Sequence, residues 1–76
     1  MEKIMEILKG IRPEFDFSTS EDFIEDGYLD SFDLVTLVSE LDETFDISID
    51  GLDIIPENFM TTETIADVVR KNGGSL

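Results

Sequence analysis

The chain contains no cysteine and no histidine among its 76 residues. The lack of cysteine excludes disulfide bonds and thiolate nucleophiles, and the lack of both excludes zinc sites built from these side chains. Histidine is also the commonest general base, so any proton transfer would have to use carboxylates, Lys, Tyr or hydroxyl groups. A chain this short cannot easily build a deep catalytic cleft as well as a core, so we expect that it is not an enzyme.

Long apolar runs are missing too. No stretch of the sequence approaches the roughly 18 apolar residues that a membrane span requires. The start of the chain, Met1-Glu2-Lys3, shows no basic region followed by an apolar run. We therefore expect no signal peptide and no membrane insertion, and we expect a cytoplasmic protein.

Basic residues are few, and the formal net charge is −14. The five cations all lie near the two ends of the chain: Lys3, Lys9, Arg12, Arg70 and Lys71. Between Pro13 and Val69 the sequence has 17 Asp and Glu residues and no Lys or Arg. These acids cannot pair with cations of their own segment, so most should face water or a partner. Such a field repels nucleic acid and attracts basic proteins.

The chain does contain enough hydrophobic residues, 41%, to form the core of a single domain over residues 1–76. The first segment places Ile4, Ile7, Leu8 and Ile11 on one helical face, and Gly10 and Pro13 should end this helix. Residues 13–30 then form a long connection. Its aromatic side chains predict that it folds over the core.

The clearest predicted helix follows Asp30. This residue is a good N-cap, and Asp33 stands at the capping-box position three residues later. One continuous apolar face follows, made of Leu34, Leu37, Val38, Leu41 and Phe45. Phe32 and Val35 fall on another side of the helix, so core packing leaves them over.

The last third of the chain is more mixed. Residues 46–51 alternate in polarity and predict a short strand or an extended loop. Pro56 can open a short helical turn through Phe59, and Thr61 or Thr62 can cap a last helix. The predicted fold class is therefore all-α: a small bundle of three main helices plus one short helix, with a long loop between the first and second helices.

Ser31 stands out because it is the first residue of the helix that Asp30 caps. Its hydroxyl should be exposed where free backbone N–H groups and the positive end of the helix dipole point outward. A phosphate attached there would meet a favourable environment. Asp30 and Asp33 oppose it by repulsion, so the helix end alone would not recruit a free anion, whereas enzymatic attachment would avoid that difficulty.

The stretch Asp26-Gly-Tyr-Leu-Asp-Ser-Phe-Asp33 resembles the signature of acyl and peptidyl carrier proteins, in which Asp-Ser-Leu opens the second helix. The similarity continues through Leu34–Phe45, Pro56–Phe59 and the last helix. Phe32 stands where Leu or Ile is commoner in this family. This departure leaves attachment to Ser31 intact but bears on which partners the chain would recognise. The resemblance implies that a phosphopantetheinyl transferase uses coenzyme A to attach a 4′-phosphopantetheine arm to Ser31, and that the arm carries an acyl or aminoacyl thioester.

The resemblance also implies that the chain is a monomer that docks on enzymes with basic surfaces. Asp30 would help the transferase to orient the site. The remaining docking residues would be Phe32, Asp33, Val35, Glu40, Asp42 and Glu43. The stretches Leu29–Ser31 and Pro56–Phe59 slightly favour a carrier that is loaded by an adenylating ligase. Other partners would be further acyl-loading and acyl-accepting enzymes.

Two other readings remain. The ligand spacing of an EF-hand calcium loop is matched by Asp46, Ser48, Asp50 and Glu57, with Gly51 at the turn. Against calcium binding, Asp53 occupies an apolar loop position and Pro56 interrupts the exit helix, so we expect no metal site. The second alternative is an acidic interaction module without a prosthetic group, which explains the charge but not the order of residues 30–32.

Overall fold

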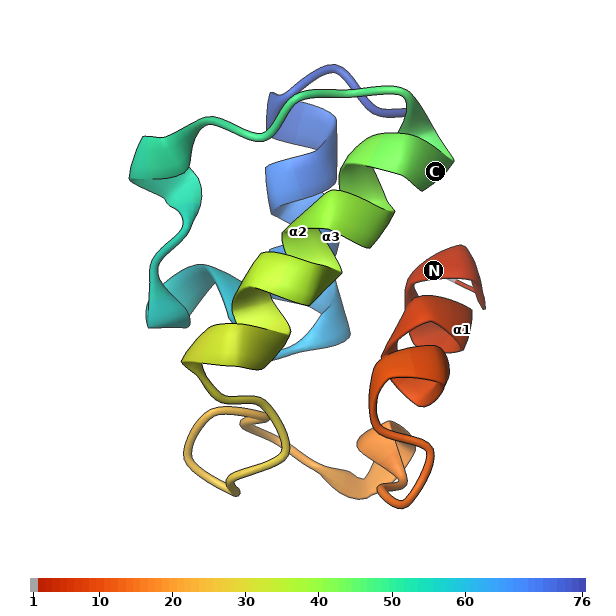
Figure 1. The fold of residues 1–76 in the computed structure, drawn as a ribbon, viewed down its shortest axis with the longest axis vertical. Coiled ribbons are helices and arrows are strands. Elements are labelled where there is room, and N and C mark those ends of the chain that lie inside the picture. Colours follow the sequence, from red (N-terminus) through yellow and green to blue (C-terminus); the bar gives the residue numbers. More distant parts are fainter. Residues whose placement is uncertain (1) are drawn as a thin grey trace.

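Three α-helices carry the fold of this computed structural model, which describes residues 2–76. They are α1 (Glu2–Ile11), α2 (Ser31–Phe45) and α3 (Thr62–Lys71). In Figure 1, α1 runs downward on the right, α2 rises across the middle and α3 lies behind α2. The described residues contain no strand, so the predicted all-α class is confirmed and residues 46–51 form no strand.

Three short 3-10 helices lie in the connections: η1 (Phe17–Thr19), η2 (Gly51–Asp53) and η3 (Pro56–Phe59). Residues 12–30, which contain η1, join α1 to α2, and residues 46–61, which contain η2 and η3, join α2 to α3. None of the helices found in residues 2–76 has the length and apolar character needed to cross a membrane.

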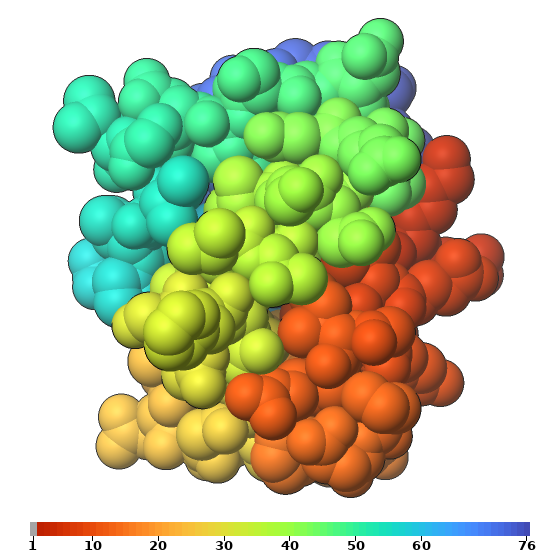
Figure 2. All heavy atoms as spheres, in the orientation of Figure 1, coloured from red at the N-terminus to blue at the C-terminus, as the bar shows by residue number. Residues whose placement is uncertain are grey.

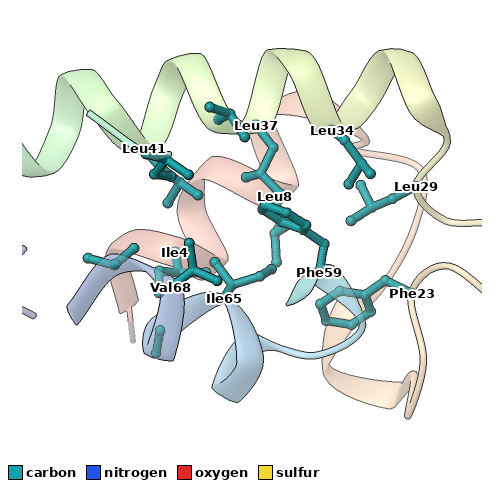
Figure 3. Packing of buried hydrophobic residues seen from close by; sticks show 14 of the residues in the cluster. Ile4, Leu8, Phe23, Leu29, Leu34, Leu37, Leu41, Phe59, Ile65 and Val68 are labelled. Atoms are coloured by element: carbon teal, nitrogen blue, oxygen red, sulfur yellow. The ribbon is translucent and has the colours of Figure 1, made fainter. Parts of the chain in front are cut away.

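The core lies between the three α-helices and is closed by residues of both connections. Figure 3 shows side chains from every α-helix pointing toward one another, together with Phe59 of η3. The labelled core residues are Ile4, Leu8, Phe23, Leu29, Leu34, Leu37, Leu41, Phe59, Ile65 and Val68. The face of α2 predicted from the sequence is buried at Leu34, Leu37, Val38 and Leu41, and Phe45 packs against the cluster from a half-buried position.

Aromatic rings hold residues 12–30 against the core. The rings of Phe15 and Tyr28 are stacked with centroids 4.4 Å apart, and Phe17 meets Phe23 edge to face at 5.0 Å. Phe17 and Phe23 are buried. Gly27, at φ +75°, provides the left-handed turn that directs the chain back toward Leu29 and the start of α2.

The helix ends differ in part from the prediction. Gly10 and Pro13 together predict the end of the first helix; α1 continues through Gly10 and ends at Ile11, two residues before Pro13, whose ring opposes continuation. At its C-terminal end, α2 stops at Asp46, which adopts the left-handed conformation at φ 54°. Thr61, one of the two predicted caps, begins α3 by a reciprocal pair of hydrogen bonds with Thr64, both of 3.1 Å.

Polar bonds fix residues 46–61 at several points. Asp42 Oδ1 accepts the backbone N–H of Ile49 at 2.9 Å. The buried carboxylate of Asp53 accepts a hydrogen bond from Lys71 Nζ at 2.7 Å. The side chain of Asn72 donates to Asp53 at 3.4 Å and also accepts the N–H of Asp50 at 3.2 Å. The connection is therefore tied to both α2 and the end of α3.

Candidate attachment site at the start of α2

Ser31 is the first residue of α2, and it is exposed. Figure 2 shows the first turns of α2, in yellow-green, at the surface of the molecule, next to cyan atoms of the connection that holds η2 and η3. Within the described residues, the hydrogen bonds of this turn are made by the neighbours of Ser31 and not by its hydroxyl. The hydroxyl is thus accessible to a macromolecule that approaches this end of the helix.

The capping box predicted around Ser31 is formed. Asp30 Oδ1 accepts the N–H of Asp33 at 3.0 Å, and Asp33 Oδ2 accepts the N–H of Asp30 at 3.1 Å. Hydrogen bonds from the backbone, chiefly the N–H of Asp33, lower the pKa of Asp30 below its ordinary value. Ser31 therefore stands between two residues whose backbone and side chains bond to each other in both directions.

Arg12 reaches this box from the end of α1. Its Nε and Nη2 atoms both lie 2.9 Å from Asp33 Oδ2, and Nη2 lies 3.4 Å from Asp30 Oδ2. Nη1 lies 3.4 Å from Glu14, so one guanidinium faces three carboxylates. The hydrogen bond to Asp33 is the main cause that raises the pKa of Arg12. No spacing pattern in the sequence indicates this contact, because 21 residues separate Arg12 from Asp33.

The structure separates the predicted docking residues into two groups. Phe32 and Val35 are exposed at 85% and 68%, and Glu40 and Glu43 are exposed as well. By contrast, Asp33 is only 9% exposed and bonds to Arg12. The carboxylate of Asp42 also has an internal bond, as described above. The docking roles stay predictions. Asp33 has the capping role expected from the sequence, and its bond to Arg12 and the bond of Asp42 to Ile49 are contacts that the sequence did not indicate.

Two exposed apolar residues of the second connection were not predicted as site residues. Leu52 in η2 is 84% exposed and Ile55, directly before η3, is 40% exposed. Their signal in the sequence is weak, because an apolar residue inside a connection is equally consistent with packing against the core. Glu40 lies elsewhere, on an open groove of about 710 Å³ between α1 and α2 that Ile7 and Thr36 also line.

The residues of the calcium-loop pattern do not form a ligand set. In residues 2–76, no three Asp, Glu, His or Cys side chains gather where they could hold one metal ion. Asp46 ends α2, and Asp50 caps η2 by accepting the N–H of Leu52 at 2.9 Å. Ser48 and Glu57 are exposed. The spacing in the sequence therefore corresponds to a helix end and a 3-10 helix cap.

Comparisons of the chain with models of protein families, with curated proteins and with solved structures give no significant match.

Proposed function

We propose that this protein is an acyl or aminoacyl carrier in which Ser31 holds a 4′-phosphopantetheine arm. The observation that carries the proposal is the exposure of Ser31 at the first position of α2, between the two residues of a capping box. The order Asp30-Ser31-Phe32 at that position resembles the carrier signature. A serine buried in the core would be out of reach of a transferase.

The attachment step is a transfer from coenzyme A. Ser31 Oγ forms a bond to the phosphorus of the coenzyme's pyrophosphate that bears the pantetheine, and the bond from this phosphorus to the bridging oxygen breaks. The hydroxyl proton goes to a base of the transferase, and adenosine 3′,5′-bisphosphate leaves. When bound, the arm supplies a terminal thiol that carries the acyl group as a thioester.

The residues around Ser31 fit a phosphodiester. The start of α2 offers the positive end of a helix dipole, which favours an attached phosphate. The nearby carboxylates of Asp30 and Asp33 oppose it, but Arg12 offsets their charge at 2.9–3.4 Å. The exposed side chains of Phe32 and Val35 give the same end of α2 an apolar surface, which a partner enzyme can cover.

The finer features of the carrier proposal follow from the resemblance. In this proposal η3 serves as the short additional helix and residues 12–30 serve as the long first loop. The partners are a phosphopantetheinyl transferase and enzymes that load and accept the acyl group, among them an adenylating ligase. The excess of acidic residues favours partners with basic docking surfaces.

The proposal is tested by incubating the purified protein with coenzyme A and a phosphopantetheinyl transferase of broad specificity. We expect the intact mass to increase by one phosphopantetheine group, and we expect a peptide map to place the group on Ser31. Ser31→Ala should remain unmodified. Ser39→Ala is the matched control, because Ser39 is also an exposed serine of α2, and this variant should be modified like the wild type.

A wild-type protein that stays unmodified under conditions in which the transferase modifies a known carrier would refute the proposal. Modification of Ser31→Ala would refute the assignment of the site.

A further inference from the structure

Arg12 is the only cation between Gly10 and Val69, and its guanidinium lies against the turn that contains Ser31. Arg12 directly follows α1, whereas Asp30 and Asp33 belong to the start of α2. The contact therefore joins the end of one helix to the beginning of the next. Its shortest distances, 2.9 Å from two guanidinium nitrogens to Asp33 Oδ2, are those of a charge-assisted hydrogen bond.

Asp33 needs this partner because its side chain is largely withdrawn from water. A buried carboxylate without a compensating charge is strongly unfavourable, and it responds by moving toward solvent or by becoming protonated. Asp33 Oδ2 accepts hydrogen bonds from Arg12 and from the N–H of Asp30 at the same time. A displaced Asp33 would thus release the backbone of Asp30, the residue that immediately precedes Ser31.

We propose that Arg12 is a positioning residue for the modification of Ser31, holding the capping box of Asp30 and Asp33 in place by offsetting its charge. This inference rests on the proposed function. Arg12 acts through the two aspartates and does not take part in the transfer step. Its effect should therefore appear in the turnover rate of arm attachment, since this rate depends on how well Ser31 Oγ is oriented in the bound complex.

The variant Arg12→Met distinguishes a positioning effect, which should appear in kcat, from a long-range charge effect, which should appear in KM. The variant removes one positive charge, which should strengthen the attraction to a basic transferase and leave KM unchanged or lower. We expect kcat for arm attachment to fall by about tenfold, because misplacement of a reacting atom by about 1 Å can cost about a hundredfold in rate. Initial rates measured against the concentration of the carrier give both constants.

Lys71→Met is the matched control. It also removes one cation from an ion pair with a buried aspartate, Asp53. Lys71 is the last residue of α3, and Figure 1 shows the last turn of α3 near the top of the molecule, whereas α2, which begins at Ser31, starts in the lower half. The chain just after α3 also lies next to the last residue of α2, because a side chain added at Gly74 would approach Phe45. We expect Lys71→Met to keep kcat within about twofold of the wild type, as for a change outside the transition-state contacts.

A second variant tests the charge argument. In Arg12→Met combined with Asp33→Asn, the amide oxygen can still accept the N–H of Asp30 but carries no charge. We expect the double variant to have the same kcat as Asp33→Asn alone, because a neutral side chain at position 33 no longer needs Arg12. If Arg12→Met by itself does not fold, as judged by circular dichroism, this comparison decides the question.

The outcomes are distinct. Three results would each overturn the role of Arg12: equal kcat for Arg12→Met and the wild type, an equal fall of kcat in Lys71→Met, or a loss of about tenfold that persists in the Asp33→Asn background. A wild-type protein that the transferase does not modify at all would instead overturn the proposed function.

Discussion

Phe32 offers the sharpest test of how the proposed carrier would meet its partners. It follows Ser31 directly, and 85% of its surface faces solvent in the isolated protein. Because it makes so little contact with the fold, Phe32→Ala should change the free energy of unfolding by no more than about 0.5 kcal/mol. The effect of the substitution should therefore fall on binding.

The expected size follows from the exposed fraction. An aromatic side chain buries about 150–250 Å² when it is fully covered, and nearly all of this surface is still available on Phe32. Covering a side chain of this size contributes about 1.5–3 kcal/mol. Each 1.4 kcal/mol corresponds to about a tenfold change in affinity. A partner that covers Phe32 should thus bind Phe32→Ala about tenfold to a hundredfold more weakly.

The assay is the concentration dependence of arm attachment, with KM for the carrier as the readout and urea unfolding as the check on stability. Leu76→Ala is the control, because Leu76 is an exposed apolar residue that lies near Phe45, at the opposite end of α2 from Ser31. It should leave KM unchanged. A KM for Phe32→Ala within about twofold of the wild type, well below the change that covering the ring implies, would refute a docking role for Phe32.

Three further predictions concern the scaffold. Phe59→Ala removes a fully buried ring and should cost about 3–5 kcal/mol, close to the whole stability of a core this small, so circular dichroism should show a largely unfolded chain; a wild-type urea midpoint would contradict the packing. The hydrogen bond from Lys71 lowers the pKa of Asp53 below its ordinary value of 3.8, so the ionised pair stabilises the fold above that pH and ceases to do so as pH falls below it. The difference in unfolding free energy between the wild type and Lys71→Met should therefore shrink in acid, and a difference that does not change with pH would refute the pair. Micromolar calcium should leave the urea midpoint unchanged, because Asp46 and Glu57 do not meet in a common ligand set; a rise that Asp46→Ala abolishes would favour the calcium loop.

Local sequence patterns predicted the start of α2 well. The cap at Asp30, the acid at Asp33 and the apolar face that begins at Leu34 involve residues within a few positions of each other, so the geometry of one helix determines their relation. The exposure of Phe32 and Val35 follows from the same geometry, because the helix can turn only one broad face to the core.

Contacts between distant segments could not be predicted in the same way. Arg12 meets Asp33 across 21 residues, and Lys71 meets Asp53 across 18. The cation-free middle of the chain suggested that its acids face outward, yet two of them are buried beside cations from outside that segment. Which of 17 acids would do so depends on how the helices pack, and spacing along the chain carries no information about it.

The calcium-loop pattern shows the opposite limit. Asp46, Asp50 and Gly51 occur at the right spacing, but the same residue types also favour helix ends and 3-10 caps. Here the backbone of Asp46 ends α2, and the side chain of Asp50 caps η2. Spacing of oxygen-bearing residues therefore becomes informative only when the exit helix is also present, and here Pro56 opens a short 3-10 helix.

The fixed connection between α2 and α3 has a consequence for the speed of recognition. Asp42 and Asn72 accept backbone N–H groups of the connection, while Leu52 projects from it into solvent. An enzyme that covers Leu52 would not have to order a flexible backbone segment first. The conformational entropy lost on binding would then be confined to a few side-chain rotamers. For a carrier of the proposed kind, such a surface would suit brief, repeated encounters with partner enzymes, because each complex can form without a slow folding step.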